Sequence, residues 1–425
     1  MSNDPSQGSS GLPPAPVPQR GLNTKEMFAA LRYPNYRLWF YGQTASLMGT
    51  WMQTTAQGFL IYQLTQSAAY LGYIGFAAGI PSWLFMLFGG VISDRMPRRK
   101  LLVITQVAMM LLAFALGLLT LSGLVQPWHI ILLAFLLGVA NAFDAPARQS
   151  FTLEMVDRED LTNAIALNAA MFNTGTAVGP AIAGLFYVWF GPGWCFLING
   201  ISFLFVIAAL LKMKLRPFVR PEKYTSPMYD LREGLRYVAA HKIIRSIILV
   251  VGVFTLLGWS FGTLVPEWAV NVLKGDATTN GLLQSLRGVG ALMGALFIAA
   301  LGRNIHRGKW VTAATFAFPV LLAIFAFVRW LPLSLVILMA VGWSTITLMN
   351  LCNALVQSQV SDQLRGRVMG IYTLVFMGIM PIGALMFGFL ADSVGSPVTL
   401  WITSGLLLTF GVVVWFAIPK LRQLK

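Results

Sequence analysis

The chain has 425 residues, of which 57% are hydrophobic and only 11% are charged. Because soluble domains carry about 25% charged residues, this composition excludes an ordinary soluble enzyme, a disordered protein and a disulfide scaffold. The net charge is +15, from 30 basic and 15 acidic residues. On a soluble protein such an excess would indicate nucleic-acid binding, so the distribution of charge along the chain decides between that function and membrane topology.

The first residues are rich in Pro, Ser, Gly and Gln and contain no apolar core. We therefore expect a disordered tail over residues 1–30 and no cleavable signal peptide. The two cysteines, Cys195 and Cys352, lie in apolar stretches, where cysteine behaves as a small hydrophobic residue. They provide neither a metal-ligand set nor a disulfide framework.

Apolar runs separated by short breaks recur along the rest of the chain. A run of about 20 apolar residues can cross a bilayer as a helix, and the alternating segments of a membrane barrel are absent. The sequence predicts twelve spans, at 37–63, 68–92, 101–122, 128–147, 163–189, 194–212, 244–266, 279–301, 310–328, 332–357, 368–391 and 398–419.

The basic residues separate by loop when the spans are counted from a cytoplasmic amino terminus. On that count 27 of the 30 lie on the cytoplasmic side, while Lys274 and Arg329 fall in outside loops and Arg287 falls inside a span. This distribution obeys the positive-inside rule. The sequence therefore predicts an all-α protein of the cell (inner) membrane with both termini in the cytoplasm, and the charge indicates topology rather than nucleic-acid binding.

The longest break divides the spans into two sets of six. The segments that begin at Asp160 and Gln363 share a polar start, a long apolar helix and a Gly/Pro cluster, at an offset close to 200 residues. Parallel repeats of this kind are typical of one group of secondary transporters. We predict an amino-terminal six-helix bundle over 31–212, a cytoplasmic linker with an amphipathic helix over 213–243, and a carboxyl-terminal bundle over 244–425.

The loop after the second span carries a charged motif made of Gly90, Asp94, Arg95, Arg98 and Arg99. Asp94 lies at a helix end, where it can pair with Arg98, and Gly90 allows close helix packing. The motif resembles the loop signature of the major facilitator superfamily, G-x-x-x-D-R-x-G-R-[RK], with Pro97 in place of the second glycine. The resemblance implies a gate that latches one half against the other; the alternative is a basic loop that only fixes topology.

The fifth span contains Gly175, Gly179, Pro180 and Gly184. This spacing resembles the antiporter motif of the same superfamily, G-x-x-x-G-P-x-x-G-G, and the alternative is ordinary glycine-rich packing. Segments 142–151, 161–173 and 364–372 are similar to the enterobactin-exporter-like branch of bacterial drug:proton antiporters. At Thr176 the sequence departs from that branch, which usually has Arg there.

Polar residues inside spans are costly and tend to face a cavity. In the first span they recur at intervals of three and four, so they share one helix face, and the tenth span shows a similar stripe. The superfamily lines its central cavity with spans one, four, seven and ten, whereas hydrogen bonding between helices is the alternative for any single residue. The substrate-cavity candidates are Gln43, Ser46, Thr50, Gln53, Gln57, Asn141, Ser344, Thr347, Asn350 and Gln357.

Three charged residues inside spans are candidates for proton coupling: Asp144, Glu267 and Arg287. Asp144 can instead pair structurally with Arg148, which lies four residues further along the same helix. Glu267 lies near the outer end of its span, where reaching the water is the simpler explanation. A pair between Glu267 and Arg287 is a further expectation that the sequence does not decide.

No G-x-x-x-x-G-K-[ST] motif supports ATP use, and no catalytic motif supports an enzyme. The sequence and the resemblance together predict a secondary active transporter that exports amphipathic small molecules, drug-like or siderophore-like, in exchange for protons by alternating access. Two alternatives stay open: an uptake symporter or lysophospholipid flippase on the same fold, and a transport-inactive membrane scaffold or receptor. The expected partners are the substrate, protons and the lipid bilayer, without nucleic acid, ATP, metal or cofactor, and the expected state is a monomer.

Overall fold

The computed structural model describes residues 28–215, 227–301 and 306–424. Most of the predicted amino-terminal tail and the centre of the predicted linker lie outside these residues. Within the described residues the secondary structure consists of helices without strands. This confirms the predicted all-α class.

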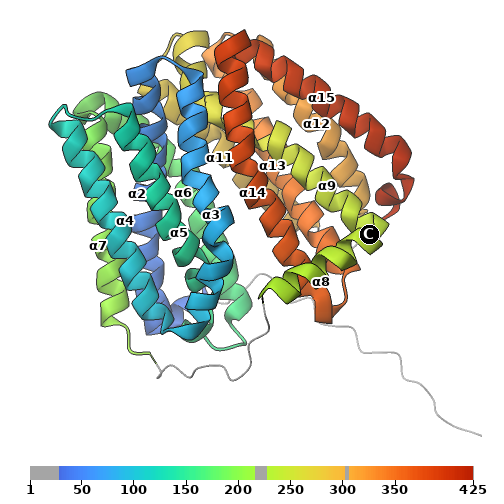
Figure 1. Cartoon of the computed structure of the whole chain (residues 1–425), viewed down its shortest axis with the longest axis horizontal. Helices are drawn as coiled ribbons and strands as arrows, with labels where there is room; N and C mark the ends of the chain where they lie inside the picture. Colours follow the sequence, from blue (N-terminus) through green and yellow to red (C-terminus); the bar gives the residue numbers. More distant parts are fainter. Residues whose placement is uncertain (1–27, 216–226, 302–305, 425) are drawn as a thin grey trace, which may run out of the picture.

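Two groups of long helices lie side by side, with the first group on the left and the second on the right in Figure 1. The first group contains α2 (Pro34–Thr65), α3 (Ala68–Arg95), α4 (Arg98–Leu121), α5 (Pro127–Met155), α6 (Leu161–Phe190) and α7 (Pro192–Lys212). The second group contains α9 (Lys242–Leu257), α11 (Ala277–Leu301), α12 (Arg307–Phe327), α13 (Leu331–Gln359), α14 (Asp362–Val394) and α15 (Ser396–Ala417). We call these groups the amino and carboxyl halves.

Ten helical segments in the described part of the chain are long and apolar enough to cross a membrane. The other two long helices are α2, with 32 residues, and α6, with 30 residues. Together they give the number of spans that the sequence predicts. The fourth span is longer than predicted, since α5 continues from 147 to Met155.

The seventh span is not the single helix predicted over 244–266. After α9 the chain forms the 3₁₀ turn η2 (Trp259–Leu264), the short helix α10 (Val265–Glu267) and the π-helical turn η3 (Trp268–Val272). Gly258 marks the break, because a side chain there would lie 2.7 Å from the carbonyl oxygen of Phe254. Pro266 then removes one backbone donor. π-helical turns are frequent at functional sites, so the break places irregular backbone where the two halves meet.

The two halves repeat the same turn chemistry. A single glycine joins α6 to α7 and α14 to α15: Gly191 has φ of 86° and Gly395 has φ of 85°. Only glycine adopts such angles without strain. Pro180 inside α6 and Pro381 inside α14 are a second matched pair. These positions support the repeat that the sequence predicts at an offset close to 200.

One end of the molecule holds η1 (Ala29–Arg32), the amphipathic helix α8 (Pro227–Ala240) and η4 (Pro419–Gln423). We call it the basic end, and the other end, at the top of Figure 1, the opposite end. Arg367 at the start of α14 holds α8 in place through Asp230 at 2.8 Å and Glu233 at 2.6 Å. The amphipathic helix predicted within 213–243 is therefore present as α8 and is attached to the carboxyl half.

Candidate functional site

The first seam between the halves joins α6 to α11. Gly184 approaches α11 so closely that a side chain there would lie 2.7 Å from the carbonyl oxygen of Ala277, and Gly281 packs against the carbonyl oxygen of Pro180. Gly175 and Gly179 instead face α2, within the amino half. The predicted antiporter motif therefore has two faces, one for its own half and one for the seam.

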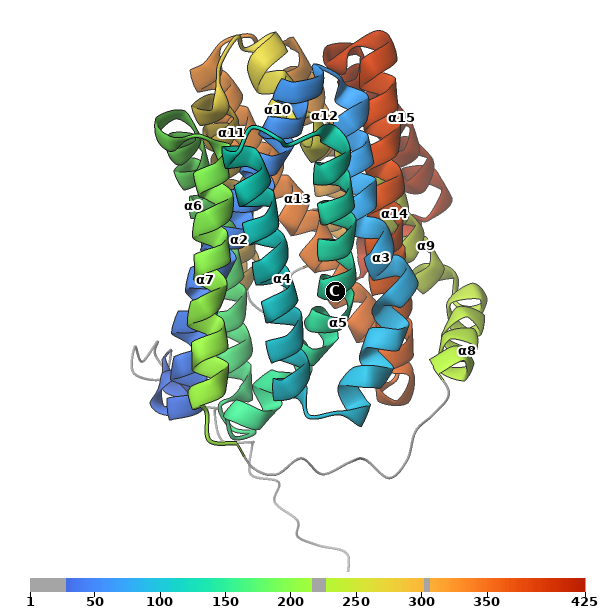
Figure 2. The same cartoon turned by 60° about the vertical axis from the view of Figure 1, so that its left-hand side comes forward.

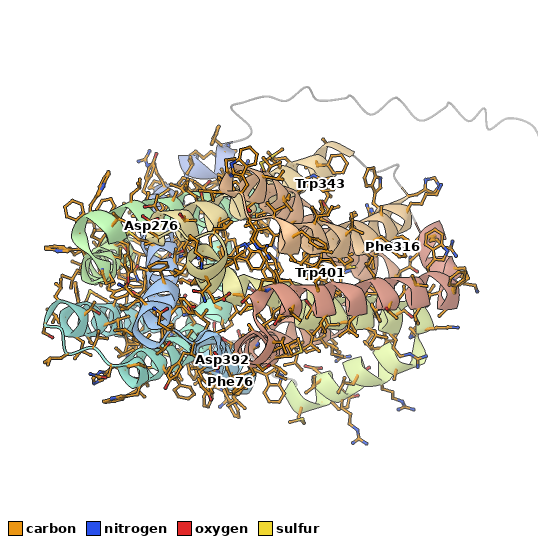
Figure 3. All side chains as sticks on the ribbon, turned by 90° about the horizontal axis from the view of Figure 1, so that it is seen from above. Phe76, Asp276, Phe316, Trp343, Asp392 and Trp401 are labelled. Atoms are coloured by element: carbon orange, nitrogen blue, oxygen red, sulfur yellow. The ribbon has the colours of Figure 1, made fainter. Side chains whose placement is uncertain are left out.

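The second seam joins α3 to α14. Gly72 and Gly388 pack directly against each other, and Gly79 packs against Pro381. At the opposite end, Asp392 accepts hydrogen bonds from the Ser67 hydroxyl at 2.9 Å and from the backbone N–H that follows it. In the view from above, Asp392 lies well apart from Asp276, which stands at the start of α11 beside the first seam (Figure 3).

Towards the basic end the two halves separate. Gly90 lies eleven residues beyond Gly79, and Gly370 lies eleven residues before Pro381, so about three helical turns carry both towards the basic end on the seam faces. A side chain at Gly90 or at Gly370 would have no neighbour within 4 Å in the described part of the chain. Ile165, on the seam face of α6, is 56% exposed. The halves thus close against each other at the opposite end and diverge at the basic end.

The charged motif lies at the basic end and ties helices of the amino half together. Arg98 binds Glu154 of α5 at 2.7 Å and lies 3.7 Å from Asp94. Arg99 donates to the carbonyl oxygens at the end of α7, at 2.7 and 3.2 Å. Arg95 is exposed beside Asp94.

The close packing expected at Gly90 falls instead on its neighbour Gly89. A side chain at Gly89 would strike the carbonyl oxygen of Ala142 in α5, whereas Gly90 faces open space. The sequence predicted this close helix contact at Gly90, whereas in this structure it occurs at Gly89. Hydropathy does not define the rotation of α3 about its axis, so it could not distinguish the two neighbouring glycines.

The polar stripe of the first span is largely buried within the amino half. Gln53 accepts a hydrogen bond from Asn199 of α7 at 2.7 Å, and Gln57 donates to a backbone oxygen of α5 at 3.4 Å. Thr50 is half-buried and donates to the backbone oxygen of Ser46. Gln43 is buried, and its Oε1 has no hydrogen-bond partner. Their role in substrate binding stays a prediction.

The tenth-span candidates divide into two pairs. Ser344 and Thr347 are fully buried, and Ser344 donates to the carbonyl oxygen of Ala314 in α12 at 3.4 Å. Asn350 and Gln357, nearer the basic end, are exposed. Only the second pair is exposed in this structure.

Asp144 lies in a buried polar cluster between α4 and α5. Its carboxylate accepts hydrogen bonds from Thr105 at 2.8 Å and Gln106 at 2.9 Å and pairs with Arg148 at 3.0 Å, with no exposed side-chain surface. These contacts tie α4 to α5 within the amino half. Asn141, one turn earlier, is half-buried and donates to a backbone oxygen of its own helix.

Glu267 lies in the broken seventh span, near the opposite end of the molecule, where the two halves meet. It is 7% exposed, and Asn271 donates to its Oε1 at 3.1 Å. The same amide nitrogen lies 2.5 Å from the hydroxyl oxygen of Tyr62, at the end of α2. Figure 2 shows α10 beside this end of α2. Among the described residues, no cation lies within 4 Å of the Glu267 carboxylate.

Arg287 projects from α11 about 15 Å from the first residue of that helix. Its guanidinium lies 5.6 Å from the centre of the Phe261 ring and against Gly262, both in η2. The side chain is half-buried, and within the described ranges it forms no ion pair. The expected pair between Glu267 and Arg287 is therefore absent from this structure.

The sequence analysis missed several residues that the structure brings into these contacts. Tyr62 and Asn271 are 209 positions apart, and no local pattern connects them. A signal was available for α11, where Asn280, Gln284 and Arg287 follow the same spacing of four and three that identified the first-span stripe.

Two facing halves of membrane-length helices, joined by glycine seams and closed at one end only, define a membrane transporter. A profile of the family described as transmembrane secretion effectors matches residues 25–425. The chain therefore belongs to this family of the major facilitator superfamily, whose members are transporters and not enzymes.

Characterised relatives resemble the chain over most of its length. The multidrug efflux pump Tap of Mycolicibacterium fortuitum is 28% identical, over 88% of this chain and 93% of the relative. The enterobactin exporter EntS of Escherichia coli is 25% identical, over 92% and 94%. The staphyloferrin A transporter of Staphylococcus aureus is 23% identical, over 82% and 87%.

Solved structures share the fold at low sequence identity. A bacterial homologue of the human lysosomal transporter Spinster, in an inward-facing and unoccupied conformation, gives a TM-score of 0.69 at 13% identity, over 94% of this chain and 98% of that one. The nucleoside transporter NupG gives 0.68 at 15% identity, over 93% and 100%. These matches support the architecture alone.

Proposed function

We propose that the chain is a monomeric, proton-coupled exporter of amphipathic small molecules that works by alternating access. The observation that carries the proposal is the geometry of the two seams, which close at the opposite end and separate at the basic end. Glycine contacts let the helix backbones slide and tilt at small cost. The efflux pumps and siderophore exporters among its relatives support export as the direction.

The basic end is the cytoplasmic end in this proposal, because loops rich in Lys and Arg stay in the cytoplasm. Both ends of the chain then lie in the cytoplasm. With this orientation, the separation at the basic end supports an inward-facing state, in which substrate would enter between the halves from the cytoplasm. Asn350 and Gln357, which are exposed, and Asn141 and Thr50, which are half-buried, are the polar candidates for this path. Gln43 is buried in this structure and stays a candidate from the sequence alone.

Glu267 is the better candidate for the proton-linked carboxylate. Asp144 pairs with Arg148 and accepts hydrogen bonds from Thr105 and Gln106, all within the amino half, so its contacts fit a structural role. Glu267 has one amide partner and no cation, although Ser396 lies beside it. An ionised carboxylate without a counter-ion is costly away from water, so its charge depends on whether the opposite end is closed. That dependence links protonation to the change of state.

Everted membrane vesicles test the function. With amphipathic fluorophores of each charge type, respiration should drive accumulation inside the vesicles, and a protonophore should abolish it. Accumulation that survives the protonophore would exclude proton coupling. Energy-dependent accumulation only in right-side-out vesicles would make the chain an uptake transporter, and a chain that moves no fluorophore would instead fit a scaffold or receptor.

A further inference from the structure

The break in the seventh span holds a cation that has no counter-ion among the residues that the structure describes. Arg287 lies about 15 Å from the start of α11, close to the middle of a bilayer core about 30 Å thick. Basic side chains at this depth normally pair with an acid or line a water-filled space, and they mark substrate pathways. Within the described ranges Arg287 pairs with no acid. The guanidinium of this partly exposed residue therefore has capacity for a ligand.

The surroundings of Arg287 fix the orientation of the guanidinium. The Phe261 ring lies 5.6 Å away, and the Phe318 ring lies 6.2 Å beyond it. Gly262 provides the space that the guanidinium occupies, since any side chain at this position would collide with it. The irregular backbone of η2 thus forms an aromatic wall on one side of a fixed, planar cation.

A second unpartnered donor lies on the same stripe of α11. Gln284 donates to Asn280 Oδ1 at 3.0 Å, which leaves Asn280 Nδ2 buried without a hydrogen bond, in a residue that is 1% exposed. Asn280, Gln284 and Arg287 are spaced by four and three residues, so they face the same way. Buried amide donors without a partner are uncommon. Asn280 Nδ2 is such a donor, and it lies on α11 between Arg287 and the opposite end of the molecule.

We propose that Arg287 forms the subsite for the carboxylate group of an amphipathic organic anion, and that the Asn280 side of the stripe contacts the polar part of the same molecule. A guanidinium binds a carboxylate through two parallel hydrogen bonds, and the Phe261 wall suits an adjoining apolar group. Because an Arg side chain keeps its proton, Arg287 attracts an anion rather than carrying a coupling proton. This inference rests on the proposed transport function and names its substrate class.

Binding of matched probes to the full chain in lipid nanodiscs tests the proposal. Pyrenebutyrate carries a carboxylate, and pyrenebutanol is its neutral analogue; fluorescence anisotropy gives both affinities after subtraction of empty nanodiscs. We expect the wild type to prefer pyrenebutyrate. Arg287→Gln should weaken pyrenebutyrate binding at least tenfold and leave pyrenebutanol unchanged, Arg287→Lys should lose less, and Lys274→Gln, which removes an exposed charge near the same helix, should change neither.

Two results would overturn the proposal. One is equal affinity of the wild type for the two probes; the other is an equal loss for both probes in Arg287→Gln, which would mark Arg287 as structural. Arg287→Lys guards against a folding defect, because it retains the charge. Binding requires no transport, so an anion preference without proton-driven accumulation would show that the proposed function has failed while the anion subsite exists.

Discussion

The side-chain amide of Asn271 donates to the hydroxyl oxygen of Tyr62 at 2.5 Å and to Glu267 at 3.1 Å. One amide group therefore connects the end of α2, in the amino half, to a buried carboxylate in the carboxyl half. Separation of the halves at the opposite end must break the contact with Tyr62 and bring water to Glu267. The closed end and the candidate proton site are thus parts of the same hydrogen-bonded unit.

Removal of the Tyr62 hydroxyl should favour opening at the opposite end. A hydrogen bond of this kind contributes about 1 kcal/mol, so Tyr62→Phe should change the ratio of closed to open molecules about fivefold. Spin labels at Ser122 and Ser393, exposed at that end in the two halves, would report longer distances by double electron–electron resonance. Because the spin labels are attached to introduced cysteines, the two native cysteines, Cys195 and Cys352, both buried, have to be replaced first.

The matched control is Tyr187→Phe. The Tyr187 hydroxyl donates to Gln63 at 2.6 Å, also at the opposite end, but both residues belong to the amino half. The label distances should not change in this variant. An equal shift in both variants would mean that the contact between Asn271 and Tyr62 does not hold the halves together.

Glu267→Gln should uncouple transport from the proton gradient. The amide keeps the size of the side chain and can still bond to Asn271, but it cannot gain or lose a proton. In everted vesicles the variant should equilibrate substrate without accumulating it, so the ratio of inside to outside concentration falls to about one. Asp276→Asn, at the exposed cap of α11, should accumulate substrate as the wild type does. Full accumulation by Glu267→Gln would exclude this carboxylate.

The spans could be predicted because hydropathy and charge are local properties. The apolar runs and the short breaks between them predicted all of these spans, α2 and α6 included. The break at Gly258 could not be predicted in this way, since Gly and Pro are frequent in regular transmembrane helices. The partner of Gln53 could not be predicted from the sequence either, because its contact with Asn199 depends on the rotation of α2 and α7 about their axes.

Asp144→Ala should destabilise the fold. The substitution leaves Arg148 without its partner at 3.0 Å and removes the acceptor of Thr105 and Gln106. Loss of one member of a buried ion pair costs about 3 kcal/mol, so the purified variant should melt several degrees below the wild type. Glu159→Ala, at an exposed acidic position of the same half, should have the same melting temperature as the wild type. An unchanged melting temperature in Asp144→Ala would refute the structural role.

Bulky substitutions at the glycines of the two ends should trap opposite states. Leucine at Gly184 would strike the carbonyl oxygen of Ala277, 2.7 Å from the position of its Cβ, so Gly184→Leu should prevent closure at the opposite end. Leucine at Gly90 or Gly370 would meet nothing in this structure. It would collide only when α3 and α14 approach each other at the basic end, so these variants should remain inward-facing.

The same spin labels distinguish the two outcomes, and transport should be lost in both. With labels at Ser122 and Ser393, Gly184→Leu should show the longer distance, and Gly90→Leu and Gly370→Leu the shorter one. Gly405→Leu is the matched control, because this glycine on α15 also has nothing within 4 Å and lies on neither seam helix. Gly184→Ala, with a smaller side chain, should shift the equilibrium less than leucine does. Normal transport by Gly90→Leu and Gly370→Leu together would mean that α3 and α14 do not close at the basic end.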